Sequence, residues 1–175
     1  MKKTFCIVAL LCTLLTSVSI AQDKAVEQAI QKAGYLLSVE SSRLQILRTD
    51  LSEITKKKLV LKELNNPQLF HITLLIENIF LAETICAYEG LLLKSLDNLK
   101  ENKKLEQYNF HYSRLKESTL NRLYLNYQST QTNIANIDDK DIIQLADKAK
   151  KEMLSVLQQI KGVITILQKI NTNPQ

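Results

Sequence analysis

This chain of 175 residues has little glycine, proline or histidine. It holds three glycines, two prolines and two histidines, and it has no tryptophan. Glycine and proline make the tight turns of hairpins, and glycine-rich loops hold the phosphates of nucleotides. Their scarcity argues against folds that need many such turns and favours long helices.

Recognisable catalytic patterns are missing as well. The chain has no Gly-x-Ser-x-Gly turn and no phosphate-binding glycine loop. His71 and His111 belong to neither a His-Glu-x-x-His pattern nor the Glu-x-x-His pattern of di-iron bundles, so we assign them structural or surface roles. We therefore expect no catalytic, cofactor or metal site, and we interpret the protein as a non-enzyme.

Three glutamates interrupt the most apolar segment and are the remaining candidates for acid–base chemistry. Glu77, Glu83 and Glu89 are six residues apart, which turns each one about 120° from the next on a helix. No helix face collects them, so we expect them to pair with basic side chains at helix edges.

The first 21 residues have the pattern of an export signal. Lys2 and Lys3 precede an apolar run over residues 5–15, and Ser19-Ile20-Ala21 places small residues before Gln22. We predict a signal peptide at 1–21 and a single domain at 22–175, exported to the periplasm or cell surface of a Gram-negative bacterium.

A membrane anchor and a lipoprotein are the alternatives to a cleaved signal. The uncharged run over residues 4–22 is about long enough to cross a bilayer, but serine and threonine thin it out. A lipidated cysteine should follow a small residue, whereas Cys6 follows Phe5 and Cys12 follows Leu11. Cleavage is favoured, and we expect no stable membrane span after it.

Charge and cysteine content limit the choice of partners. The net charge of +5 falls to +3 once Lys2 and Lys3 leave with the signal, which is too small to imply a nucleic-acid partner. Cys86 would then be alone, so no internal disulfide can form. A buried, inert thiol is favoured over an intermolecular bridge.

Apolar spacing predicts two helices in the first half of the domain. The first covers residues 23–64, and Asn66 caps a second that begins at Pro67. Because residues 69–93 are apolar on nearly every face, we expect other helices to surround this second helix. The seam of the first helix has apolar residues at 3-4 spacing, interrupted by Glu40 and Lys58: Val26, Ile30, Ala33, Leu37, Leu44, Leu47, Leu51, Ile54 and Leu61.

Two further helices are predicted in the second half. Residues 97–104 are interpreted as a turn, with a continuous helix left open, and a third helix covers 105–130. After a loop at 133–137, Asp138 caps a fourth helix. The fold class is therefore all-α, an elongated antiparallel bundle of about four helices. The fourth helix has an unbroken seam: Leu145, Ala149, Met153, Val156, Ile160, Val163, Leu167 and Ile170.

An aromatic cluster on the third helix is the best candidate for a partner-binding site. Tyrosine suits binding surfaces because it contributes a large area with little rotamer entropy. Packing within the bundle is the alternative reading and stays open. The cluster comprises Tyr108, Phe110, Tyr112, Tyr124 and Tyr127.

The chain resembles the exported helical transfer proteins of conjugative transposons, which are similar to the minor-pilin or pilus-tip component of type IV secretion systems. The resemblance rests on the signal ending at Ala21-Gln22, a long amphipathic helix, the break at residues 64–70 and a final helix opening at residues 137–143. It covers most of the mature chain and supplies no catalytic residues. It implies an envelope assembly protein that helps DNA transfer without binding DNA itself.

The leading hypothesis is therefore a non-enzymatic component of a cell-envelope transfer apparatus, with envelope proteins as partners. A periplasmic helical chaperone or stress protein that binds unfolded clients is the alternative. A secreted enzyme or metal-binding bundle is a third class, for which the sequence offers no site. Oligomeric state stays open, because long seams can close within one chain or between copies.

Overall fold

The computed structural model describes residues 2–96 and 101–172, and the side chains of 24–96 and 103–170. The elements in chain order are α1 (Lys2–Val60), α2 (Asn66–Ser95), α3 (Glu101–Arg114), the π-helical turn η2 (Leu115–Thr119), α4 (Leu120–Ile134) and α5 (Lys140–Thr172). No strand occurs in these described ranges. The all-α prediction is confirmed.

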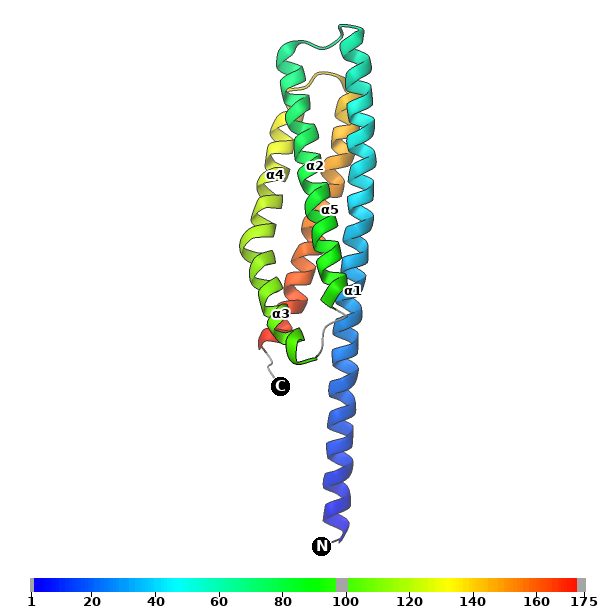
Figure 1. The fold of residues 1–175 in the computed structure, drawn as a ribbon, viewed down its shortest axis with the longest axis vertical. Helices are drawn as coiled ribbons and strands as arrows, with labels where there is room; N and C mark the ends of the chain where they lie inside the picture. The colour runs from blue at the N-terminus through cyan, green and yellow to red at the C-terminus, as the bar shows by residue number, and fades with distance from the viewer. Residues whose placement is uncertain (1, 97–100, 173–175) are drawn as a thin grey trace.

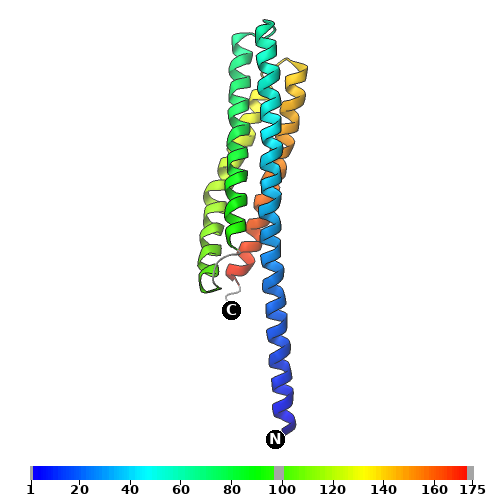
Figure 2. The same ribbon diagram turned by 45° about the vertical axis from the view of Figure 1, so that its right-hand side comes forward.

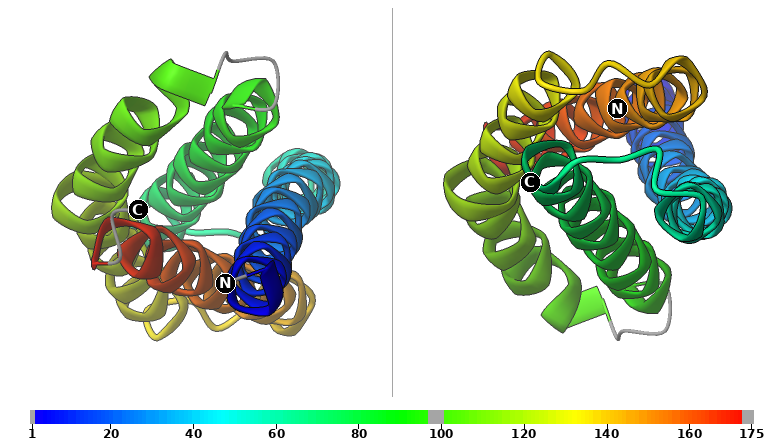
Figure 3. Two further views of the ribbon diagram at one scale, coloured as in Figure 1. Left: turned by 90° about the horizontal axis from the view of Figure 1, so that it is seen from below. Right: turned by 90° about the horizontal axis from the view of Figure 1, so that it is seen from above.

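The helices form an elongated bundle of four antiparallel rods (Figure 1). The segments α3, η2 and α4 follow one another as one rod. Seen along the axis, α2 lies between α1 and the α3–α4 rod (Figure 3). On the side opposite α2, α5 packs between the same two rods. The N-terminal part of α1, drawn in blue, extends beyond the other helices (Figures 1 and 2).

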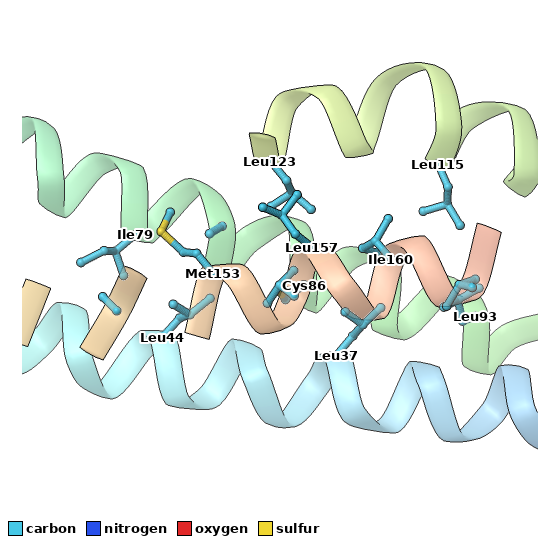
Figure 4. Close-up of a cluster of buried hydrophobic side chains, with 14 of the residues drawn as sticks. Leu37, Leu44, Ile79, Cys86, Leu93, Leu115, Leu123, Met153, Leu157 and Ile160 are labelled. Carbon is cyan, nitrogen blue, oxygen red and sulfur yellow. The ribbon is translucent and has the colours of Figure 1, made fainter. Parts of the chain in front are cut away.

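The predicted seams of α1 and α5 face each other across the core. Leu37 and Leu44 of α1 point toward Met153 and Ile160 of α5, and residues of α2 and the α3–α4 rod complete the cluster (Figure 4). Burying each large aliphatic side chain is worth roughly 1.5–3 kcal/mol. Hydrophobic burial along these seams is therefore the main source of stability.

Both helix starts that the sequence suggested are shifted by one residue. The Asn65 side chain, not that of Asn66, accepts a hydrogen bond from the Gln68 backbone N–H (2.9 Å), and Gln68 Oε1 accepts one from Asn65 N–H. This reciprocal capping box needs a glutamine three residues after the cap, which fits only Asn65. At α5 the cap is Asp139 rather than Asp138, and it accepts from the Ile142 N–H at 3.1 Å.

The predicted end of the first helix also needs correction. α1 ends at Val60 because Lys62 adopts a left-handed conformation with φ 58°. The Glu63 N–H then reaches the carbonyl of Lys58, and the Lys62 N–H reaches that of Leu59. These two bonds make a Schellman motif, which normally uses glycine. Leu61 is consequently exposed and not part of the seam.

The third helix is longer than expected. It begins at Glu101 rather than Leu105 and continues through η2 to Ile134. Part of the predicted turn, residues 97–100, lies outside the described residues, and the rest of it, residues 101–104, is helical. The expected loop at 133–137 begins after Ile134.

Lys58, one of the two polar residues in the α1 seam, joins α1 to the start of α5. Its ammonium group lies 2.7 Å from Asp139 and 3.2 Å from Asp141. The hydrogen bond with Asp139 is the largest of the effects that raise the pKa of Lys58. Partial burial raises the pKa of Asp139, but the bond from Lys58 and the backbone N–H groups outweigh it, so that pKa is lowered. The cap of α5 is thus held in its charged form.

Glu40, the other polar residue that interrupts the α1 seam, also joins α1 to α5, in this case near the middle of the bundle. Glu40 is buried and accepts hydrogen bonds from the Ser155 hydroxyl and the Gln159 amide of α5, each at 3.0 Å. Arg43 lies 3.5 Å from Glu40 and 3.6 Å from Glu152. Hydrogen bonding with Glu40, together with burial, raises the pKa of Glu152. Both polar interruptions of the seam therefore fix α1 against α5.

Two glycines let α1 and α2 approach closely. A Cβ atom built on Gly90 would lie 2.7 Å from Ser38 Oγ and 2.9 Å from the carbonyl oxygen of Gly34. The sequence left open whether Gly90 marks a bend or a close approach. Since α2 continues as a helix past Gly90 to Ser95, close approach is its role.

We expect Gly90→Ala to lower the free energy of unfolding by ~1–3 kcal/mol, because the added methyl group must push α1 and α2 apart. Gly162→Ala is the matched control, since a Cβ there meets nothing within 4 Å. It should stabilise the protein by about 0.5–1 kcal/mol, as alanine does in a helix. Urea denaturation followed by circular dichroism measures both, and equal effects would contradict the close approach.

Candidate functional site

The five aromatic residues of the predicted partner site do not share one exposed surface. Tyr108 is only 8% exposed and belongs to the core, and Tyr112 and Tyr127 are partly buried against it. Phe110 and Tyr124 are 58% and 50% exposed. These two are 14 residues apart, which places them roughly 20 Å apart along the rod. The structure therefore brings three of the five to the core and leaves two as separate exposed rings.

A buried ion pair lies between α2 and the α3–α4 rod. Glu89 is 2% exposed and receives both Nη groups of Arg114, one of them at 2.6 Å, together with the Thr119 hydroxyl at 3.0 Å. A buried carboxylate is tolerated only when it is paired and hydrogen-bonded. Glu83 pairs similarly with Arg48 at 2.7 Å. The expectation of basic partners is thus confirmed for these two glutamates.

The π-helical turn is what brings both partners to Glu89. Arg114 immediately precedes η2, and Thr119 is its last residue. In an α-helix, residues five apart point about 140° away from each other. In a π-helix the hydrogen bonds join residues i and i+5, so such residues lie one above the other. Consistent with this pattern, the N–H of Leu120 donates to the carbonyl of Leu115.

His111 completes this buried polar group. Its Nδ1 lies 3.2 Å from Arg114 Nη2, and because arginine only donates, Nδ1 accepts and the ring proton lies on Nε2. Burial, together with the nearby positive charge of Arg114, lowers the pKa of His111 from 6.5 to about 4. His111 is therefore neutral at physiological pH and helps to orient Arg114.

A pocket of about 330 Å³ opens beside the ion pair. Arg114 lies over the Tyr88 ring at 5.3 Å, and Arg122 is exposed at the pocket with no ion-pair partner among the described residues. The wall on α2 is mainly apolar, and the wall on η2 and α4 is polar. The lining residues are Leu81, Thr84, Ile85, Tyr88, Glu89, Arg114, Ser118, Thr119 and Arg122.

The outward side of α2 carries an unusual number of exposed apolar side chains. The helix lies at the front of the bundle in Figure 1, and no other helix covers that side. The residues of this side recur at helical spacing, with Thr84 near the middle of the row. Glu77 is the one charged residue among them. We name this surface the α2 outer face; its apolar residues are Phe70, Phe80, Leu81, Tyr88 and Leu91.

The expectation that other helices surround α2 is therefore wrong for this face. Phe70, Phe80 and Leu81 are exposed, whereas Ile72, Leu75 and Ile79 are buried. A four-helix bundle covers only part of each helix, so a helix that is apolar all round leaves one apolar side uncovered. Among the residues whose side chains the structure describes (24–96 and 103–170), α2 is the helix that is long and apolar enough to cross a bilayer by length and composition.

Two other reactive side chains, Cys86 and His71, are held within the bundle. Cys86 is fully buried, and burial, followed by the nearby charges of Glu40 and Glu89, raises the pKa of its thiol to about 12. A thiol at such a pKa is protonated and unreactive. His71 bonds Asn133 at 3.0 Å. No group of three or more metal-binding side chains occurs in the part of the chain that the structure describes.

The fold and this site define an all-α, four-rod helical bundle in which α2 has an exposed apolar face. No protein-family model matches the chain, and no curated protein or solved structure matches it. The chain's own residues therefore carry the functional argument.

We predict a specific pH dependence of stability from His111. The folded protein keeps this ring neutral down to about pH 4, whereas a free histidine protonates near 6.5. The unfolded state thus binds more protons between these values, so the free energy of unfolding falls as pH falls, by up to ~1.4 kcal/mol per pH unit.

In His111→Gln this loss between pH 6.5 and pH 5 should largely disappear, because glutamine does not titrate. Gln128→Ala, an exposed change on α4 that removes no titratable group, is the control and should keep the wild-type slope. Urea denaturation at a series of pH values measures all three proteins. A wild-type slope in His111→Gln would show that His111 is not held neutral by the fold.

Proposed function

We propose that the protein is a non-enzymatic, exported structural component of a cell-envelope conjugative transfer apparatus, similar to type IV secretion. In this proposal the bundle is a rigid spacer, and the α2 outer face docks an envelope partner. The observation that carries it is this exposed apolar face, which extends from Phe70 to Leu91, about 32 Å at 1.5 Å per residue. The pattern of the export signal and the absence of a catalytic signature in the sequence support it.

Charges around the α2 outer face indicate what the partner should offer. Arg48 lies over the Phe80 ring at 5.2 Å, Lys94 over that of Tyr35 on α1 at 5.9 Å, and Arg122 borders Leu81. Glu83 is paired with Arg48, and Glu89 is paired with Arg114. Lys94 and Arg122 are therefore the basic residues at this face that have no acidic partner among the described residues. The partner we propose is therefore an envelope protein that presents an apolar helix with acidic flanks.

A second copy of this chain is a poorer occupant of the same face. Two α2 outer faces placed together would bring their basic borders toward each other, and like charges at an interface are unfavourable. Glu77 supplies only one acidic group against them on each copy. Charge complementarity thus favours a different protein.

Photocrosslinking in the producing cells tests the proposal. A photoreactive amino acid replaces Thr84, which is exposed at the centre of the α2 outer face, and in a control it replaces Lys148, which is exposed on α5. We expect one or a few discrete adducts at Thr84 alone. Mass spectrometry should identify them as envelope proteins of a transfer apparatus.

A paired substitution makes this test sharper. Leu91→Glu places a charge at the most exposed apolar position of the face, and Leu154→Glu makes the same change on α5. The first should abolish the Thr84 adduct and the second should leave it. Many unrelated adducts would point instead to a chaperone, and an adduct of two identical chains to self-association; either result would overturn the proposal.

A further inference from the structure

We propose that the pocket between α2 and η2 binds a small monocarboxylate with an apolar body. The pocket has unused hydrogen-bond donors on one side and an apolar wall on the other. This ligand-binding role is separate from the docking role, because a small ligand can bind to this chain without a partner protein.

Three groups at the pocket lack an acceptor among the described residues. The Arg122 guanidinium forms no ion pair, and no described residue hydrogen-bonds the Ser118 hydroxyl. The Nε group of Arg114 is buried without a hydrogen-bond partner. A ligand that brings acceptor oxygens would pair with the Arg122 guanidinium and the Ser118 hydroxyl, which line the pocket.

The charge of the pocket fits a monoanion. Arg114 and Arg122 supply two positive charges and Glu89 supplies one negative charge, so one positive charge is left. Both oxygens of Glu89 already accept hydrogen bonds from Arg114, and one also accepts from Thr119. Glu89 therefore does not compete for Arg122. A carboxylate matches the planar donor fork of arginine, whereas a phosphate dianion would leave a net negative charge.

The opposite wall favours an apolar ligand body. Leu81, Ile85 and Tyr88 line it together with Thr84, whose hydroxyl donates to the Phe80 carbonyl. The volume of about 330 Å³ lies at the lower end of the range for small-molecule sites. The turn η2 supplies Ser118 and Thr119 to the site, and π-turns inside helices occur frequently at functional sites.

Titration of the purified full chain with chosen probes tests this site. The carboxylates are octanoate, for a free aliphatic acid, and N-acetylphenylalanine, for the C-terminus of a peptide; the controls are the two corresponding amides and inorganic phosphate. Binding is followed by calorimetry and by NMR shifts of the amides. We expect at least one carboxylate to bind about tenfold more tightly than its amide. The tighter carboxylate identifies the source of the ligand.

Variants connect the binding to the named residues. Arg122→Gln should weaken carboxylate binding about tenfold, and Ser118→Ala should weaken it by a smaller factor. Lys148→Gln makes the same charge change on an exposed site of α5 and should leave binding unchanged. Circular dichroism verifies that each variant is folded.

Three kinds of result would overturn the proposal. The first is a failure to prefer carboxylates, either because carboxylates and amides bind equally or because no probe binds. Another is tighter binding of phosphate than of either carboxylate. The third is wild-type affinity in Arg122→Gln. Because no partner protein is present, failure here leaves the docking proposal standing, and failure of the crosslinking experiment leaves this site standing.

Discussion

The buried carboxylate of Glu89 is the constraint on which the second half of the structure depends. A buried charge must be paired, and the pair here comes from Arg114 with support from Thr119. Both reach Glu89 because the helix switches to a π-turn between them. That turn also separates α3, which packs mainly on α5, from α4, which packs on both α2 and α5. His111, whose pKa is lowered first by burial and then by the charge of Arg114, contacts the same pair.

Elsewhere in the bundle, other polar residues in or beside the seams also fix one helix against another. Lys58 holds α1 to the cap of α5, Glu40 holds the middle of α1 to α5, and Arg48 holds α1 to Glu83 of α2. Leucine and isoleucine seams can slide by a turn at little cost, whereas each of these polar bonds forms in one register only. Hydrophobic burial thus supplies most of the stability, and the buried polar contacts select one alignment of the rods.

Periodic features of the sequence predicted the fold well, since seams at 3-4 spacing and the scarcity of glycine and proline follow directly from helix geometry. The π-turn was missed because residues 115–119 contain no glycine or proline to mark it. The partners of Glu89 were missed because Arg114 is 25 residues away in sequence. The α2 outer face was misjudged because an apolar composition on all sides does not say which side the other helices cover. The helix cap at Asn65, by contrast, could have been predicted from the sequence, because Gln68 lies three residues after it.

A double-mutant cycle on Glu89→Leu and Arg114→Leu tests most directly whether this ion pair controls how the α3–α4 rod lies on α2. Each single variant leaves an unpaired buried charge, so each should lose ~3–5 kcal/mol of unfolding free energy. The double variant should lose several kcal/mol less than the sum of the two. Additive losses, within ~0.5 kcal/mol, would mean that the two side chains act independently and would contradict this account.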